Sequence, residues 1–193
     1  YKLDRNYPEG LEAQVDEYLA KLEAAMGKKL GDENDPLLVS VRSGAAISMP
    51  GMMDTILNLG LNDKAVEGLA KKTGNEKFAY DAYRRFIQMY GDVAMGVDHD
   101  KFEAILEEVK EKAGVDSDQK LSVENLKEVV AKYKEMYKAE KGEEFPQDAK
   151  KQMWGAIGAV FGSWMNPRAI KYRKLNNIKE GALKGTAVSV MAM

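Results

Sequence analysis

Residues 37–60 read LLVSVRSGAAISMPGMMDTILNLG, and this stretch decides which fold the chain is expected to adopt. Apolar and polar side chains alternate over residues 37–42, which is the period of two that a β-strand produces. A loop of glycine, serine and other small residues follows Arg42, and the strand pattern returns from Thr55 to Leu59. The stretch therefore predicts two short strands joined by a flexible loop, with Arg42 at the end of the first strand.

Arg42 and the loop that follows it have the chemistry of a polyphosphate site. The guanidinium group stays charged and can donate two parallel hydrogen bonds to phosphate oxygens. Hydroxyls and unobstructed backbone N–H groups come from Ser43, Gly44, Ser48 and Gly51. The loop is neither Gly-x-x-x-x-Gly-Lys-Ser/Thr nor Gly-x-Gly-x-x-Gly, so its spacing alone also fits an ordinary hairpin with an exposed arginine.

The second half of the loop offers further candidates, whose roles the residues alone leave open. Asp54 and Thr55 can hold a Mg²⁺-bound water or a phosphate oxygen, or they can simply cap the turn. Met49, Met52 and Met53 can line an adenine pocket, or they can fill gaps in a nearby core. The residues alone do not decide between the two roles in either case.

Composition narrows the function classes. The 193-residue chain has a net charge of −2, with 45% hydrophobic and 31% charged residues, so neither nucleic acid nor a membrane is an expected partner. The absence of cysteine excludes thiol catalysis and a disulfide framework, and it favours a cytoplasmic location. The chain has one histidine, His99, so a histidine cluster within this chain is excluded. His99 is interpreted as a surface residue at a helix start.

Helical periodicity dominates the rest of the sequence. Helices are expected over residues 8–26, 63–72, 76–90, 100–113 and 122–140. Another helix is expected to start at Phe145-Pro146, and Asn166-Pro167 ends it and begins a shorter one. After a turn from Gly181 to Gly185, residues 186–193 alternate like a strand. The charged helices between residues 62 and 147 predict a helical lobe inserted into an α+β core.

Several segments along the chain have a specific wording. They are SVRSGA (40–45), SMPGMMDTILNLG (48–60), FAYDAYRRFIQMY (78–90), GEEFPQ (142–147), SW (163–164), NPRAIKYR (166–173) and GTAV (185–188). In this order, and spread along nearly the whole chain, they resemble the nucleotide-binding domain of pyruvate phosphate dikinase.

The resemblance implies an ATP-grasp-like domain in which Arg42 contacts the ATP phosphates and serves phosphoryl transfer. The loop that covers the nucleotide in that family corresponds to Ser48, Gly51, Met52, Met53, Asp54 and Thr55. The family interconverts ATP, phosphate and pyruvate with AMP, diphosphate and phosphoenolpyruvate. The resemblance also implies Mg²⁺ bound with ATP, transfer to a histidine on another domain of the same parent chain, and a homodimeric parent.

The expected organisation is a nucleotide-binding core lobe of residues 1–61 and 148–181, with a helical insertion lobe of residues 62–147. Residues 182–193 are expected to be the first strand of a truncated second ATP-grasp lobe. The resemblance places an ATP-contacting lysine before Tyr1 and acidic Mg²⁺ ligands after Met193. The chain is therefore expected to be truncated at both ends and inactive by itself. A terminal strand without a partner would also leave an open hydrophobic edge near residues 186–193.

Two departures from the family pattern reduce the expected polar contacts. Ala46-Ile47 stands where some members carry an arginine and a small residue, and Met191 stands where the strand often has a glutamine. Two alternatives remain open, namely a related dikinase such as phosphoenolpyruvate synthase and a non-catalytic helical docking module.

Other conspicuous residues have structural interpretations. Arg84-Arg85, Arg168 and Arg173 are expected to pair with carboxylates, although Arg168 or Arg173 can instead shape the nucleotide cleft. Trp154 and Trp164 are expected to be core residues.

Overall fold

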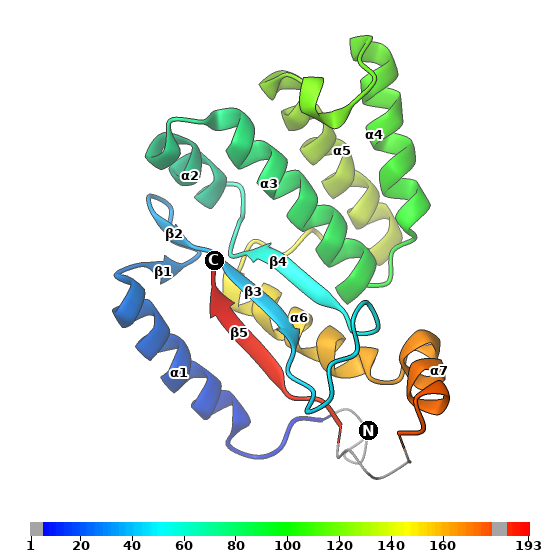
Figure 1. The fold of residues 1–193 in the computed structure, drawn as a ribbon. Helices are drawn as coiled ribbons and strands as arrows, with labels where there is room; N and C mark the ends of the chain where they lie inside the picture. The colour runs from blue at the N-terminus through cyan, green and yellow to red at the C-terminus, as the bar shows by residue number, and fades with distance from the viewer. Residues whose placement is uncertain (1–5, 179–184) are drawn as a thin grey trace.

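The computed structural model describes residues 6–178 and 185–193 and centres on a three-stranded sheet (Figure 1). Its strands are β3 (Val39–Ser43), β4 (Thr55–Leu59) and β5 (Val188–Ala192). They stand in the order β4-β3-β5, and both neighbouring pairs are antiparallel. The predicted strand–loop–strand unit is thus confirmed. Most of the turn expected from Gly181 to Gly185 lies outside the described residues.

The strand expected over residues 37–42 is divided in the structure. Pro36–Leu37 forms β2, which pairs in parallel with β1 (Lys29–Leu30), and β3 begins only at Val39. Alternation of apolar residues cannot reveal this division, because both pieces have buried side chains.

Pairing register separates an apolar face of the sheet from a polar one. Val41 stands opposite Ile56 in β4 and Val190 in β5. Its neighbour Arg42 stands opposite Thr55 and Ser189. Successive residues of a strand point to opposite faces, so Thr55, Arg42 and Ser189 form one polar row across the second face.

Helix α6 (Ala149–Ser163) packs against all three strands of the sheet (Figure 1). Its buried Gln152 side chain donates to the Leu61 carbonyl at 2.9 Å and accepts from the Gly60 N–H at 3.3 Å. The prediction that this helix starts at Phe145-Pro146 is wrong. Asp148 caps it by accepting from the Lys151 N–H at 2.7 Å, while Phe145 is buried before the first turn.

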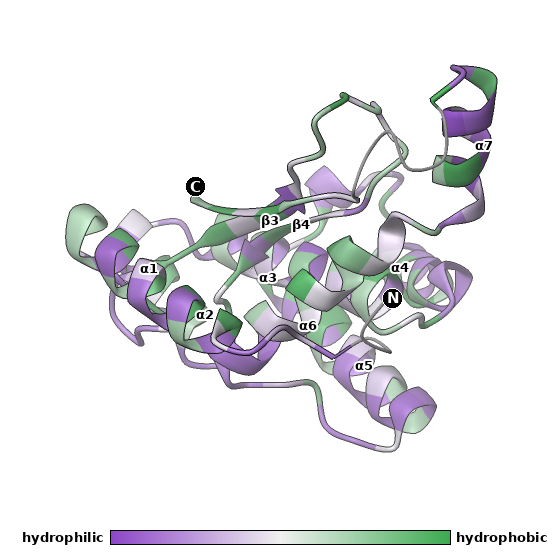
Figure 2. Cartoon of the chain, turned by 90° about the horizontal axis from the view of Figure 1, so that it is seen from below, coloured by the Kyte–Doolittle hydropathy of each residue, from purple (hydrophilic) through white to green (hydrophobic). Residues whose placement is uncertain are grey.

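The helical segment contains α2 (Ala65–Thr73), α3 (Glu76–Met89), α4 (His99–Ala113) and α5 (Val123–Lys141). The four predicted helices are confirmed within two residues. A π-helical turn, Tyr90–Ala94, extends α3, and a 3₁₀ turn, Asp118–Lys120, precedes α5. Hydrophilic colours run along α5, whereas β3 and β4 are mostly hydrophobic (Figure 2). Each of the four helices buries some of its residues and leaves the others at the surface.

Two further helices flank the sheet. Helix α1 (Leu11–Met26) begins three residues after Pro8, because Gly10 has a left-handed φ of 81° that interrupts the helix. Helix α7 (Pro167–Leu175) starts as predicted behind Asn166 and lies beside the 44–54 loop (Figure 1). Residues 1–5 lie outside the described part of the chain.

Strand β5 belongs to the same sheet as β3 and β4. All five of its residues pair with β3, so the expectation of a terminal strand without any partner is wrong. Among the described residues no strand pairs with its other edge, and Met191 and Met193 are 42% and 58% exposed. The assignment of residues 182–193 to a second lobe, like the other lobe boundaries, stays a prediction.

Candidate functional site

Arg42 lies near the end of the central strand, where β3 opens into the 44–54 loop (Figure 1). Its side chain is exposed and forms no hydrogen bond or ion pair with any residue that the structure describes. Thr55 and Ser189 stand on either side of it in the polar row. A cation without a partner, placed between two hydroxyl-bearing residues, is suited to binding an anion with several oxygens.

The first end of the loop is fixed to the segment that leads into β5. The Ser43 and Thr186 hydroxyl oxygens are 2.7 Å apart, and the Gly44 N–H donates to the Ala187 carbonyl at 2.8 Å. A Cβ at Gly44 would lie 3.1 Å from the Ser189 hydroxyl oxygen, closer than side chains normally pack. Glycine therefore lets the loop leave the sheet beside Arg42.

The tip of the loop is exposed and turns tightly. Ser48 and Gly51 are exposed, and Gly51 has a left-handed φ of 70°. The Met52 N–H donates to the Met49 carbonyl at 3.0 Å and closes the turn. Met49 is only 6% exposed and is packed into the protein interior, whereas Met52 and Met53 are half-buried. Of the three methionines considered for an adenine pocket, Met49 is thus the least accessible.

The second end of the loop is fixed by Asp54. Its Oδ1 forms an ion pair with the Arg168 guanidinium, and its Oδ2 accepts from Asn166 Nδ2 at 3.1 Å. The Asp54 N–H donates to Ser163 Oγ at 3.2 Å. With both carboxylate oxygens engaged and the side chain only 11% exposed, Asp54 anchors the loop and offers no free ligand to a metal ion.

The contacts of Asp54 are the part of the site that sequence reasoning missed. Ser163, Asn166 and Arg168 follow Asp54 by more than 100 residues. The NPR wording of residues 166–168 gave a signal, because it places polar side chains at the start of a helix. Nothing in the sequence, however, states which loop those side chains face. Arg168 thus pairs with a carboxylate, as expected, and that carboxylate belongs to the loop.

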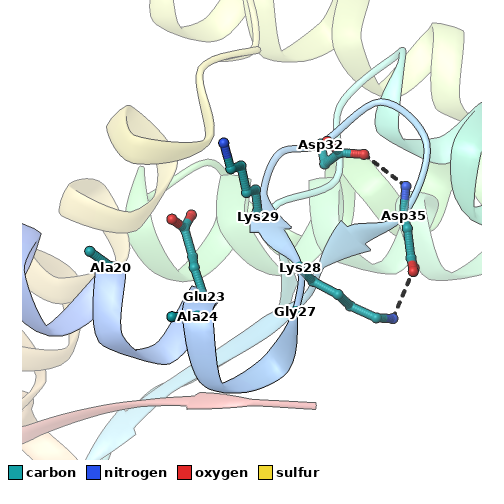
Figure 3. A pocket seen from close by; sticks show the side chains of 8 residues that line it. All are labelled: Ala20, Glu23, Ala24, Gly27, Lys28, Lys29, Asp32 and Asp35. Carbon is teal, nitrogen blue, oxygen red and sulfur yellow. Dashed lines mark hydrogen bonds and ion pairs between the residues drawn. The ribbon is translucent and has the colours of Figure 1, made fainter.

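A separate hollow of about 500 Å³ lies between the end of α1 and the β1–β2 turn (Figure 3). It is lined by Ala20, Glu23, Ala24, Gly27, Lys28, Lys29, Asp32 and Asp35. Lys28 and Lys72 pair with Asp35 at 2.9 and 3.1 Å and hold its pKa below the usual value. Backbone N–H groups of Asp35 and Asn34 likewise lower the pKa of Asp32. No residue of the 42–55 segment lines this hollow, so it is not part of the candidate site.

Other polar groups have structural partners. Arg84 is 3% exposed and pairs with Asp81 at 2.9 Å and with Asp118 at 3.2 Å. His99 is exposed at the first residue of α4, with Asp92 3.1 Å from Nδ1, which confirms the surface interpretation. Arg173 stacks on Trp164 at 4.1 Å and donates to its carbonyl at 2.8 Å. Trp154 and Trp164 are half-buried, and therefore less enclosed than expected.

Within residues 6–178 and 185–193, none of the helices is long and apolar enough to cross a membrane. In the same part of the chain, no group of three or more His, Asp or Glu side chains is arranged to hold a metal ion.

Comparison with known proteins connects this geometry to a family. A family model described as "Pyruvate phosphate dikinase, AMP/ATP-binding domain" matches residues 3–193. The chain belongs to this family. The resemblance noted from the loop and the later segments is thereby confirmed.

Full-length members of the pyruvate phosphate dikinase family are much longer than this chain. The protein named pyruvate, phosphate dikinase from Clostridium symbiosum is 57% identical over 194 residues, which cover 100% of this chain and 22% of that protein. The one from Rhizobium meliloti (strain 1021) is 56% identical over 189 residues, 98% of this chain and 21% of that protein. Pyruvate, phosphate dikinase 1, chloroplastic, from Arabidopsis thaliana is 57% identical over 189 residues, which cover 98% of this chain and 19% of that protein. The chain spans about a fifth of these relatives.

Proposed function

We propose that this chain binds the phosphates of Mg·ATP at Arg42, under the 44–54 loop, in an ATP-grasp-like domain that delivers a phosphoryl group to a histidine on another domain. The observation that carries the proposal is the exposed Arg42, which has no partner among the described residues, at the strand end of an AMP/ATP-binding family domain. Ser48, Gly51, Met52, Met53 and Thr55 would contact the nucleotide, and Asp54 would hold their loop in place.

The chemistry follows from the charge and position of Arg42. A phosphoryl group in transfer carries negative charge spread over its equatorial oxygens, and a fixed cation beside it lowers the barrier. Arg42 sits on the central strand, so hydrogen bonds on both sides hold its backbone. The Thr55 and Ser189 hydroxyls would donate to further phosphate oxygens. These residues orient the phosphates, and no side chain in the polar row has to move a proton.

Magnesium enters this proposal as part of the substrate Mg·ATP. The described residues around Arg42 do not fit a protein-held Mg²⁺ site, because Asp54 is already bound by Arg168 and Asn166. The ion would be carried by the phosphates of ATP.

For the whole enzyme we propose the reaction after which the relatives are named. ATP, phosphate and pyruvate would give AMP, diphosphate and phosphoenolpyruvate, so two phosphoryl groups leave ATP and reach different acceptors. The acceptor histidine would lie on another domain of the same protein, and the whole protein would be a homodimer. By itself the 193-residue chain is proposed to be inactive.

The two alternatives have less support. The relatives described above are named pyruvate, phosphate dikinase rather than phosphoenolpyruvate synthase. A docking module would need an apolar patch on the helical segment, but Phe78, at 51% exposure, is the one exposed large apolar side chain within residues 62–147. A single exposed residue does not make a docking surface.

The proposal is tested in a chimaera in which this chain replaces the corresponding segment of the Clostridium symbiosum relative. ATP labelled at its β and γ phosphates should give protein-bound label that acid releases and base does not, as a phosphohistidine would. Arg42→Ala should reduce the rate of labelling by about 100-fold, because the transferring group loses a charged contact. Lys21→Ala, which removes an exposed cation paired with Glu17, is the control. Equal labelling in Arg42→Ala and Lys21→Ala would refute the proposal.

A further inference from the structure

We infer that Asp54, Asn166 and Arg168 form a latch that fixes the position of the 44–54 loop relative to Arg42. Asn166 and Arg168 are then positioning residues of the nucleotide site. The inference rests on the proposed function for its purpose. It rests on the contacts of α7 with the loop for its geometry.

The latch connects one short segment of the loop to one corner of the fold. On the loop side are the Asp54 carboxylate and the Met52 carbonyl, and on the other side are Asn166 and Arg168, at the start of α7. Arg168 contacts both loop groups, since Nη2 pairs with Asp54 Oδ1 and Nε donates to the Met52 oxygen at 3.2 Å. One guanidinium therefore fixes the residues that bracket Met53.

Asn166 contributes independent support, because its side chain forgoes its usual role. It is the N-cap residue of α7, a position where asparagine normally accepts from a backbone N–H of the first turn. The Asn166 side chain makes no such capping bond, and its amide instead donates to Asp54 Oδ2 at 3.1 Å. The start of α7 is thus arranged to hold the loop at the expense of its own cap.

The backbone around the latch fixes its orientation. Pro167 is the first residue of α7, and its fixed φ is already suited to a helix, so it defines where the helix begins. Ser163, at the end of α6, is 1% exposed, accepts from the Asp54 N–H and donates to the Val160 carbonyl at 2.7 Å. Three residues from two helices therefore converge on Asp54.

The consequence for the site follows from the position of Asp54 in the chain. Thr55 comes next and pairs with Arg42 across the sheet, so holding Asp54 fixes where the loop begins to rise from the polar row. The exposed tip of the loop can then move over a ligand while the two ends of the loop stay in place. A loop that is already ordered loses less entropy when it closes on a nucleotide.

Amide hydrogen exchange on the 193-residue chain tests the latch without any nucleotide. The Met52 and Asp54 N–H groups are hydrogen-bonded in the closed arrangement, to the Met49 carbonyl and the Ser163 hydroxyl. In Arg168→Ala these two amides should exchange about tenfold faster, as expected when a charge-assisted contact no longer opposes local opening. In Arg168→Lys, which keeps the charge, the exchange rates of these two amides should lie between those of the wild type and those of Arg168→Ala.

The matched control is Arg173→Ala, on the same helix. Arg173 contacts Trp164 and no residue of the loop, so exchange at Met52 and Asp54 should stay within about twofold of the wild type. Unchanged exchange in Arg168→Ala, or equal acceleration in Arg173→Ala, would overturn the latch.

The positioning role has its own readout in the chimaera. Arg168→Ala should raise the KM for ATP about tenfold and lower kcat less, with partial recovery in Arg168→Lys, because the loop must be ordered before it binds. An unchanged KM together with faster exchange would overturn the positioning role. If the chimaera failed to use ATP at all, the proposed function would fail, while the exchange result would still decide the latch.

Discussion

Three arginines of this chain have different surroundings, and their surroundings separate their roles. Arg84 is buried among carboxylates inside the helical segment, where it stabilises the packing of α3. Arg168 is half exposed and pairs with the nearly buried Asp54 of the loop. Arg42 alone of the three has no partner among the described residues. Its charge is therefore available to a ligand, and we assign the phosphates of ATP to it.

Gly68 in α2 provides a test of packing at the scale of one residue. An added Cβ would lie 2.7 Å from the Glu33 carbonyl carbon, and backbone cannot move aside cheaply. Gly68→Ala should therefore lower the free energy of unfolding by about 1–3 kcal/mol. Lys71→Ala, at an exposed position of the same helix, should change it by no more than about 0.5 kcal/mol. Urea unfolding measures both, and equal effects would contradict this packing.

At the scale of elements, local signals predicted the kind of each main helix and strand correctly, and tertiary contacts decided their limits. Alternation was sufficient for β4, and apolar periodicity with a Ser122 cap was sufficient for α5. The start of α6 was misplaced because Phe145 packs against Tyr83 and Phe86 of α3, more than 50 residues earlier in the chain. Arg42 and the loop were recognisable as a candidate site, but the partners of Asp54 were not, since only the fold brings α7 to the loop.

Tyr90, at the first residue of the π-helical turn, gives that element a dependence on pH. Burial, followed by the charge of Glu143, raises the pKa of Tyr90 from 10.0 to about 12. Because the folded state favours the neutral form of Tyr90, the contribution of this side chain to the free energy of unfolding is complete below pH 10. It is lost as the pH rises toward 12 and beyond. Two pKa units correspond to about 2.7 kcal/mol. Tyr90→Phe should reduce the alkaline loss of unfolding free energy by up to about that amount.

The measurement is urea unfolding at intervals between pH 9 and pH 12. Tyr18→Phe, which removes the hydroxyl of a tyrosine that is 65% exposed, serves as the comparison. If the slope for Tyr90→Phe matched that for Tyr18→Phe, the assignment to Tyr90 would be wrong.

At the scale of the whole molecule, one continuous core connects the sheet with the helical segment. Phe145 stands in the connection between α5 and α6, and its ring contacts four other rings. The partners are Tyr83, Phe86, Tyr90 and Tyr137, at centroid distances of 6.4, 5.8, 5.6 and 5.4 Å. The helical segment is thus packed onto the sheet layer rather than tethered to it. The lobe boundaries, the cytoplasmic location and the homodimer stay predictions.

Phe145→Ala should accordingly destabilise the described structure as one unit. Losing this ring should lower the free energy of unfolding by about 3–5 kcal/mol. Tryptophan fluorescence, which reports on α6, and far-ultraviolet circular dichroism, which reports mainly on the helical segment, should shift together. Phe78→Ala, at an exposed position, is the control and should change little. Separate transitions by the two methods would contradict a continuous core.

Calorimetric titration of the magnesium complex of α,β-methylene-ATP into the chimaera tests the central claim most directly. This analogue cannot transfer its β and γ phosphates, so the titration measures the contribution of Arg42 to nucleotide binding without any chemistry. We predict that Arg42→Ala weakens the affinity for this analogue by about 10- to 100-fold, whereas Lys21→Ala does not. Equal affinities in the wild type and in Arg42→Ala would show that the phosphates lie elsewhere, and would contradict the assignment of the site.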